Sequence, residues 1–142
     1  MQLPSFSIAL LSLMGAASKA QAWEFTAYSN TRDCNPSQSP AFRVLTGAPS
    51  LTNCFTFTRD MPGTGCTHWS DFGRTRSNCD RDSFQYPASV WIRGGFCAIF
   101  NAENCDSNNG ASAVIFNNVC GTLPVAGNPN ALWPIRSYWC SG

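Results

Sequence analysis

Short runs of alternating apolar and polar residues recur along the chain after residue 22. The runs are WEFTAY (23–28), AFRVL (41–45), CFTFT (54–58), SVWIR (89–93), FCAIF (96–100), SAVIF (112–116) and RSYWC (136–140). Period-two alternation with many β-branched and aromatic residues is typical of half-buried strands, and helical periodicity is almost absent. The pattern predicts an all-β, single-domain protein with one antiparallel sandwich or barrel of about 7–8 short strands.

Turn-forming residues separate these runs. Gly94-Gly95 joins two of them and favours a hairpin with a two-residue turn, because glycine accepts positive φ. The NNG stretch at 108–110 predicts another turn. Residues 123–134 (LPVAGNPNALWP) contain three prolines and predict a long ordered loop before the last strand.

A weak internal repeat links the two halves of the chain. The segment from WEFTAY to TNCF resembles the segment from FCAIF to NNVCG, so that Cys34 matches Cys105 and Cys54 matches Cys120. Two copies of a four-strand unit would bury a shared core between two sheets. The alternative is chance similarity between strands in a chain rich in cysteine and asparagine.

The first 22 residues predict a secretory signal peptide. An apolar run from Phe6 to Ala17 precedes Ala20-Gln21-Ala22, which has the A-x-A form of a cleavage site. The run is shorter than the roughly 20 apolar residues that cross a bilayer, so no membrane span is expected. We therefore expect residues 23–142 to form a single secreted, extracellular β domain.

All eight cysteines lie after the signal, at positions 34, 54, 66, 79, 97, 105, 120 and 140. An even number in a short secreted chain predicts a disulfide framework, and the absence of any C-x-x-C argues against zinc. We expect neither a metal nor another cofactor. Proximity and the repeat favour the pairs Cys34–Cys54, Cys66–Cys79 and Cys105–Cys120, which leaves Cys97–Cys140.

Charge and composition exclude some function classes. Lys19 is the only lysine and lies in the signal, so that eight arginines balance eight acidic residues in the mature part. A neutral domain lacks the positive charge of nucleic-acid binders, and no nucleic acid is expected as a partner. We expect a monomer.

No pattern in the sequence indicates that catalytic groups are brought together in one site. His68 is the only histidine, with Asp71 three residues later. Carboxylates for glycoside hydrolysis could come from Glu24, Asp71, Asp80, Asp82 or Glu103, but nothing brings two of them together. The sequence therefore predicts a protein that is not an enzyme, with no catalytic residues.

The stretches WEFTAYSNTRDC (23–34) and GFCAIFNAENC (95–105), with the signal and the eight cysteines, resemble the small secreted cysteine-rich proteins of filamentous fungi. This resemblance implies a compact disulfide-rich sandwich or a βγ-crystallin-type double Greek key, and often an effector role on a host. The group also contains antimicrobial toxins and cell-wall proteins. NNGASA (108–113) resembles the crystallin calcium motif except at Ala113, and a polar turn is the alternative.

Half of the formal charges of the mature chain lie between Arg59 and Asp82. We interpret 59–82 as a charged loop, pinned by Cys66 and Cys79 and presented on a rigid scaffold for binding. The alternative is a solvated face whose mixed charges form ion pairs. The candidate binding residues are Arg59, His68, Trp69, Asp71, Arg74, Arg76 and Arg81.

The tryptophans divide into two groups. Trp23, Trp91 and Trp139 lie in predicted strands and are expected in the core. Trp69 and Trp133 are the surface candidates for stacking on sugar rings, with burial as loop anchors as the alternative. The predicted function is that of a secreted, non-enzymatic effector-like protein that binds an extracellular protein or polysaccharide of a host or competitor. A cell-wall or glycan-binding module and a small secreted toxin or hydrolase are the alternatives.

Overall fold

The structure, a computed structural model, describes residues 22–29, 31–80 and 86–142. Residues 1–21 of the predicted signal peptide lie outside the described residues, as do Arg81 and Asp82. The strands are β1 (Trp23–Tyr28), β2 (Ala41–Gly47), β3 (Phe55–Thr56), β4 (Gly65–Ser70), β5 (Thr75–Asn78), β6 (Ser89–Arg93), β7 (Phe96–Phe100), β8 (Ser112–Phe116), β9 (Cys120–Thr122), β10 (Pro124–Val125), β11 (Asn128–Leu132) and β12 (Ser137–Ser141). One short 3-10 helix, η1 (Glu103–Cys105), follows β7. The all-β prediction is confirmed, with more strands than expected.

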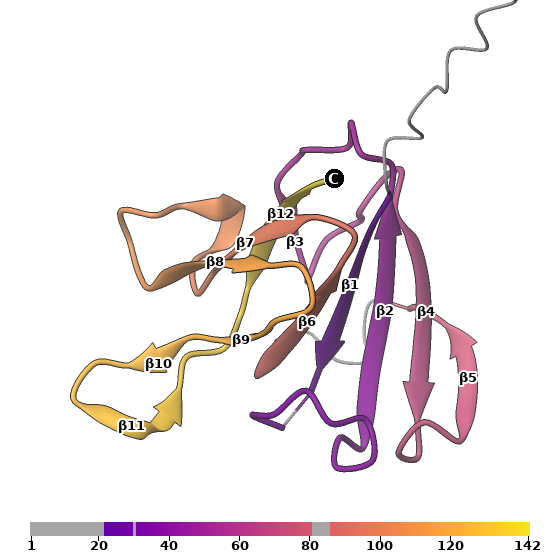
Figure 1. Ribbon diagram of the computed structural model, residues 1–142, viewed down its shortest axis with the longest axis horizontal. Coiled ribbons are helices and arrows are strands. Elements are labelled where there is room, and N and C mark those ends of the chain that lie inside the picture. The colour runs from indigo at the N-terminus through magenta and orange to yellow at the C-terminus, as the bar shows by residue number, and fades with distance from the viewer. Residues whose placement is uncertain (1–21, 30, 81–85) are drawn as a thin grey trace, which may run out of the picture.

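Two antiparallel sheets form a sandwich, shown in Figure 1. One sheet has six strands in the order β5-β4-β2-β1-β6-β9, and the other has four in the order β3-β12-β7-β8. Strands β10 and β11 form a separate two-stranded hairpin. No helix among the described residues is long and apolar enough to cross a membrane.

The core lies between the two sheets. Phe25 from β1 stacks on Tyr138 from β12, with ring centroids 4.3 Å apart, and Trp23 meets the same tyrosine edge-on. All three side chains have no exposed surface. Complete burial of such a side chain stabilises the fold by about 1.5–3 kcal/mol, so this aromatic cluster joins the sheets. The predicted burial of Trp23 is confirmed.

The predicted repeat is visible in the topology. The order β2-β1-β6-β9 in the larger sheet is equivalent to β8-β7-β12-β3 in the smaller one. Each unit therefore places its first, second and fourth strands in one sheet and its third strand in the other. Phe42, opposite Tyr28 at the end of β1, corresponds to Ser112, opposite Phe100 at the end of β7.

This exchange of third strands explains the disulfides. The structure contains the predicted pairs Cys66–Cys79 and Cys97–Cys140. The predicted pairs Cys34–Cys54 and Cys105–Cys120 are wrong, because the bridges are Cys34–Cys120 and Cys54–Cys105. Bridges between units form because Cys54, just before β3, and Cys120, in β9, each belong to a sheet otherwise built by the other unit. The corresponding Cys34 and Cys105 also share a left-handed backbone, with φ of 53° at both.

Two turn predictions are also wrong. Gly94-Gly95 does not close a hairpin, because β6 belongs to the six-stranded sheet and β7 to the four-stranded one. The connection crosses between the sheets, and a Cβ at Gly95 would lie 2.2 Å from the Ser141 carbonyl oxygen, which excludes other residues there. Residues 123–134 are not a loop, since they contain β10 and β11.

Candidate functional site

The charged segment is a hairpin rather than a loop. Strands β4 and β5 pair from Thr67 opposite Asn78 to Ser70 opposite Thr75, and β4 pairs with β2 on its other side. The Cys66–Cys79 bridge closes the open end of the hairpin. The sequence did not predict β5 as a strand. All four of its residues (TRSN) are exposed and polar, so the segment lacks the alternation of apolar and polar residues that marks a half-buried strand.

An aromatic surface covers the outer face of β2 and β4. We call Phe42, Trp69 and Phe72 the aromatic shelf. Trp69 stacks on Phe42 with ring centroids 6.0 Å apart and an interplanar angle of 17°, and Phe42 in turn contacts Tyr28. Trp69 is half-buried, so one side of the ring is supported while part of it stays accessible. The expectation that Trp69 lies in a loop is wrong, since it belongs to β4.

The shelf borders a shallow hollow of about 450 Å³. Its lining residues are Pro36, Ser37, Phe42, Trp69, Phe72 and Gly73. Aromatic and aliphatic surface with one hydroxyl is a suitable lining for a flat ligand that has both apolar and polar edges.

The turn between β4 and β5 holds an aromatic residue in an unfavourable conformation. Asp71, Phe72 and Gly73 have φ of 49°, 55° and 83°. The Gly73 N–H donates to the Ser70 carbonyl at 3.1 Å, and positive φ at the two central residues, Asp71 and Phe72, suits this tight turn. For a bulky residue such as Phe72 this region costs about 1–2 kcal/mol, and its side chain is nevertheless 49% exposed. Strain combined with exposure favours a functional role for Phe72.

Charged residues lie beside the shelf on β5 and in the β4–β5 turn. The Arg76 guanidinium carbon lies 5.9 Å from the centroid of the Trp69 ring, in cation–π contact. Arg74 forms an ion pair of 4.0 Å with Asp71, and both side chains are largely exposed. An exposed pair of this kind is worth less than about 1 kcal/mol, so a ligand can replace it at little cost.

The inner face of β2, opposite the shelf, carries a buried charged residue, Arg43. The side chain of Arg43 in β2, opposite His68 in the register, is 1% exposed and donates from Nη2 to the Asp80 carbonyl oxygen at 3.1 Å. Burial lowers the pKa of Arg43, and the Asp80 carboxylate acts in the opposite direction. A small cavity of about 160 Å³ lies beside it, lined by Arg43, Phe57, Arg59, Asp60, Met61, Thr64, Cys66, Cys79 and Asp80.

His68 belongs to this inner region. Its Nδ1 lies 3.2 Å from the Ser77 hydroxyl oxygen. Burial and, to a lesser extent, the charge of Arg43 lower the pKa of His68, which keeps the ring neutral at pH 7. The adjacent residues Trp69 and His68 thus point to opposite sides of β4.

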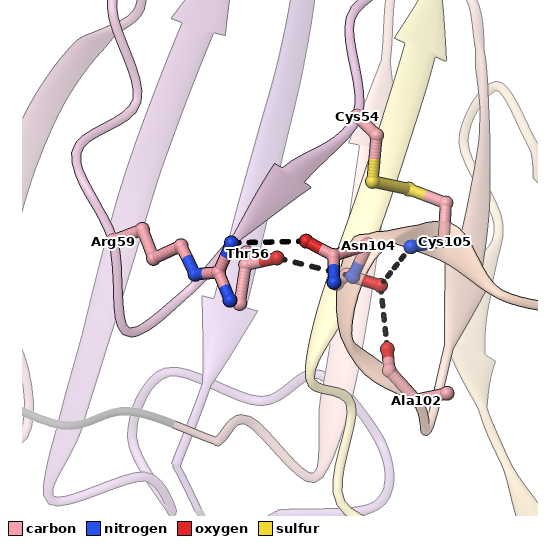
Figure 2. Close-up of a disulfide and its surroundings, with 7 residues drawn as sticks. Cys54, Thr56, Arg59, Ala102, Asn104 and Cys105 are labelled. Atoms are coloured by element: carbon pink, nitrogen blue, oxygen red, sulfur yellow. Dashed lines mark hydrogen bonds between the residues drawn. A yellow bond between two sulfur atoms is a disulfide. The ribbon is translucent and has the colours of Figure 1, made fainter.

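Arg59 contacts the other unit and not the shelf. Its Nη2 donates to Glu103 Oε2 at 3.1 Å, and its Nη1 donates to Asn104 Oδ1 at 3.1 Å. Figure 2 shows the Arg59–Asn104 hydrogen bond beside the Cys54–Cys105 bridge, where the Asn104 N–H also donates to the Thr56 hydroxyl at 3.2 Å. The structure therefore brings together Trp69, Asp71, Arg74 and Arg76, and separates them from Arg59 and His68.

Sequence reasoning missed Phe42 and Phe72. The alternation in AFRVL could have placed Phe42 on the face opposite Arg43 and Leu45, whereas nothing in the sequence marks the turn at Phe72. Trp91 and Trp139 are half-buried on outer faces, and their expected place in the core is wrong. Trp133 is 41% exposed and lies after β11, away from the shelf.

The NNG segment forms a polar turn. The Asp106 carboxylate accepts hydrogen bonds from the Asn108 N–H at 2.8 Å and from Asn109 Nδ2 at 2.6 Å. The bond from the Asn109 side chain, followed by that from the Asn108 backbone, lowers the pKa of Asp106. The Asp106 carboxylate is thus engaged in hydrogen bonds within the turn, whereas a calcium site at NNGASA would need it as a ligand.

One family model matches the chain over residues 23–129, and it is described as "Secreted LysM effector LysM14, C-terminal domain". The matched range includes every cysteine except Cys140 and the whole β4–β5 hairpin. No curated protein and no solved structure matches, so the crystallin-type likeness is not confirmed.

Proposed function

The chain belongs to the family of the secreted LysM effector LysM14 C-terminal domain, and from this membership we propose that it binds an extracellular polysaccharide on the aromatic shelf. It is a secreted, effector-like protein of the extracellular space with four disulfides. The proposal assigns it a binding role without catalysis. The LysM name in the family description also favours a glycan ligand.

The observation that carries this proposal is the stack of Trp69 on Phe42 beside the exposed Phe72. The C–H bonds on one face of a pyranose ring pack well against an aromatic face, and its hydroxyls project sideways. Arg76, whose guanidinium lies over the Trp69 ring, and Ser37, in the lining of the hollow, supply polar groups that such hydroxyls could contact. Because the shelf sits on paired strands closed by a disulfide, little conformational entropy would be lost on binding.

The test is retention of the oxidised domain on insoluble chitin, β-glucan, cellulose and xylan, with bound and free protein quantified. We expect wild type to bind one of these polymers. Trp69→Ala removes the central ring and should weaken binding about 30-fold, the roughly 2 kcal/mol of a hot-spot residue. Trp133→Ala is the matched control, since it removes an exposed tryptophan away from the shelf. Absence of retention on all four polymers, or equal retention of both variants, would overturn the proposal.

A protein ligand is the second candidate, favoured by the two exposed arginines of the hairpin. Arginine and tryptophan are enriched at interface hot spots. The β4–β5 hairpin carries residues of both types together with an acidic one, namely Trp69, Asp71, Arg74 and Arg76. In this case Arg74→Glu together with Arg76→Glu would abolish capture of a single protein from host extracts. Loss of that capture with unchanged polysaccharide retention would separate the two functions.

A further inference from the structure

The edges formed by β2 and β8 are equivalent in the two units, but only the β2 edge is covered by a further strand. In the six-stranded sheet β2 pairs with β4 on the side away from β1. Its counterpart β8 pairs with β7 and ends the four-stranded sheet, with no strand of the described ranges on its other side. The edge that β4 covers in one unit is therefore open in the other.

The register shows which backbone groups face this open edge. The Asn101 N–H donates to the Ala111 carbonyl at 3.0 Å, one position before Phe100 pairs with Ser112. Backbone groups alternate in direction along an antiparallel strand, so those of Ala113 and Ile115 face β7. Those of Ser112 and Val114 consequently point away from the sheet.

Strand β8 lacks the usual protection of an edge. Its sequence, SAVIF, contains no charge and no proline, and Val114 and Phe116 are 51% and 63% exposed. Proteins normally block such an edge with charged residues, bulges or proline, because it can pair with another strand. The opposite end of the sandwich follows that rule, since β5 is polar and carries Arg76.

We propose that two copies of this chain associate through β8, which pairs with itself in antiparallel fashion about a two-fold axis at Val114. In this register Val114 lies opposite Val114 of the second copy, and Ser112 lies opposite Phe116. The two four-stranded sheets then continue into one another. A dimer of this kind differs from the monomer expected from the sequence.

The outer faces of the two copies are complementary in this register. A shallow hollow of about 410 Å³ lies at the Ser112 end of β8, lined by Ala98, Phe100, Ser107, Ser112, Ala113, Val114 and Trp139. Phe116 of the second copy, opposite Ser112, lies at this hollow. The symmetry forms the contact twice, as in other two-fold interfaces.

The other unit already contains the same arrangement within one chain. Trp69 is opposite Phe42 and stacks on it. Phe42 corresponds to Ser112, so Phe116 of the second copy occupies the place that Trp69 occupies on β2. The reciprocity of aromatic ring and hollow on one strand favours a second copy over an unrelated strand as the occupant.

Sedimentation equilibrium of the oxidised domain from about 1 µM to 1 mM tests this proposal. We expect wild type to reach twice the monomer mass as concentration rises. Val114→Lys places two like charges at the axis and should raise the dimer dissociation constant about tenfold or more. Trp133→Lys adds the same charge at another exposed apolar residue and should leave the association unchanged.

Hydrogen exchange gives a second measurement that does not depend on a variant. The Val114 amide should become protected as concentration increases, while amides of the β4–β5 hairpin should not change. A wild-type chain that stays monomeric throughout the range would overturn the proposal. So would a dimer that Val114→Lys and Trp133→Lys weaken equally, since its interface would lie elsewhere.

Discussion

Strands β2 and β8 are equivalent edges of the two repeated units, but the hairpin inserted within each unit covers only β2. The connection between β3 and β6 contains the β4–β5 hairpin, which covers β2. The equivalent connection between β9 and β12 contains the β10–β11 hairpin, which forms a separate sheet and does not pair with β8. One insertion extends its sheet, and the other leaves the edge open.

The difference between the two units is concentrated at the covered edge. The two units share strand order and a pair of corresponding disulfides. They differ at the covered edge, where the inserted hairpin adds Trp69 on the outside and the residues around Arg43 on the inside. Arg43 corresponds to Ala113 in the other unit, so the buried charge accompanies the hairpin.

The largest expected effect is on the inner side of the covered edge. Arg43→Ala removes a fully buried side chain and leaves the surrounding acidic groups without its charge, which should lower the free energy of unfolding by about 4 kcal/mol. Chemical denaturation measures the change. Arg74→Ala is the control, because this exposed arginine should contribute less than about 0.5 kcal/mol. A loss below about 1 kcal/mol for Arg43→Ala would show that the covered edge does not depend on the buried charge.

Removal of the bridge that closes the hairpin should have the next largest effect. Cys66→Ser with Cys79→Ser opens a loop with a sequence separation of 13 residues. The loss of unfolding free energy should be about 3 kcal/mol. Amides of β4 and β5 should exchange faster than those of β7 and β8, as measured by hydrogen exchange. Uniform loss of protection across both units would contradict a separately attached hairpin.

Substitution of Phe72 should change the free energy of unfolding and the binding of polysaccharide in opposite directions. Phe72→Asn puts a residue that tolerates positive φ at the strained position, and the free energy of unfolding should rise by about 1 kcal/mol. Retention on the polysaccharide should fall at the same time, because part of the shelf is removed. Thermal unfolding and the retention assay measure the two effects. A variant that is neither more stable nor weaker in binding would remove Phe72 from the site.

The smallest effect concerns pH. The folded-state pKa of His68 lies below its unfolded value of about 6.5, because burial disfavours the charged ring. The unfolded chain thus binds the proton more readily, so stability is present above pH 6.5 and decreases as pH falls through the lowered pKa. His68→Gln should remove this slope between pH 7 and pH 5 in denaturation experiments. Binding at the shelf should be the same at both pH values, since Trp69 faces the other side of β4.

The strands of the two repeated units could be predicted from the sequence better than the inserted β4–β5 hairpin. Strands of the two units alternate clearly, as in WEFTAY and SAVIF, because one face is buried against the opposite sheet. Strand β5 extends only one edge and buries neither face, so TRSN carries no alternation that could be recognised. The crossing at Gly94-Gly95 and the bridges of Cys34 and Cys54 depend on which sheet receives each strand. Local sequence does not encode that choice, whereas the bridge Cys66–Cys79 lies within one hairpin and could be predicted.

The span of the Cys34–Cys120 bridge has a consequence for the way the protein is made. The two residues are 86 positions apart, whereas Cys66 and Cys79 are separated by 13. During secretion, Cys66 can meet its correct partner as soon as a short piece of chain has entered the oxidising compartment. Cys34 must wait until Cys120 has followed, and in that interval Cys54 is the nearest thiol. Correct biosynthesis therefore requires either delayed oxidation of Cys34 or an isomerase that removes a premature Cys34–Cys54 bond.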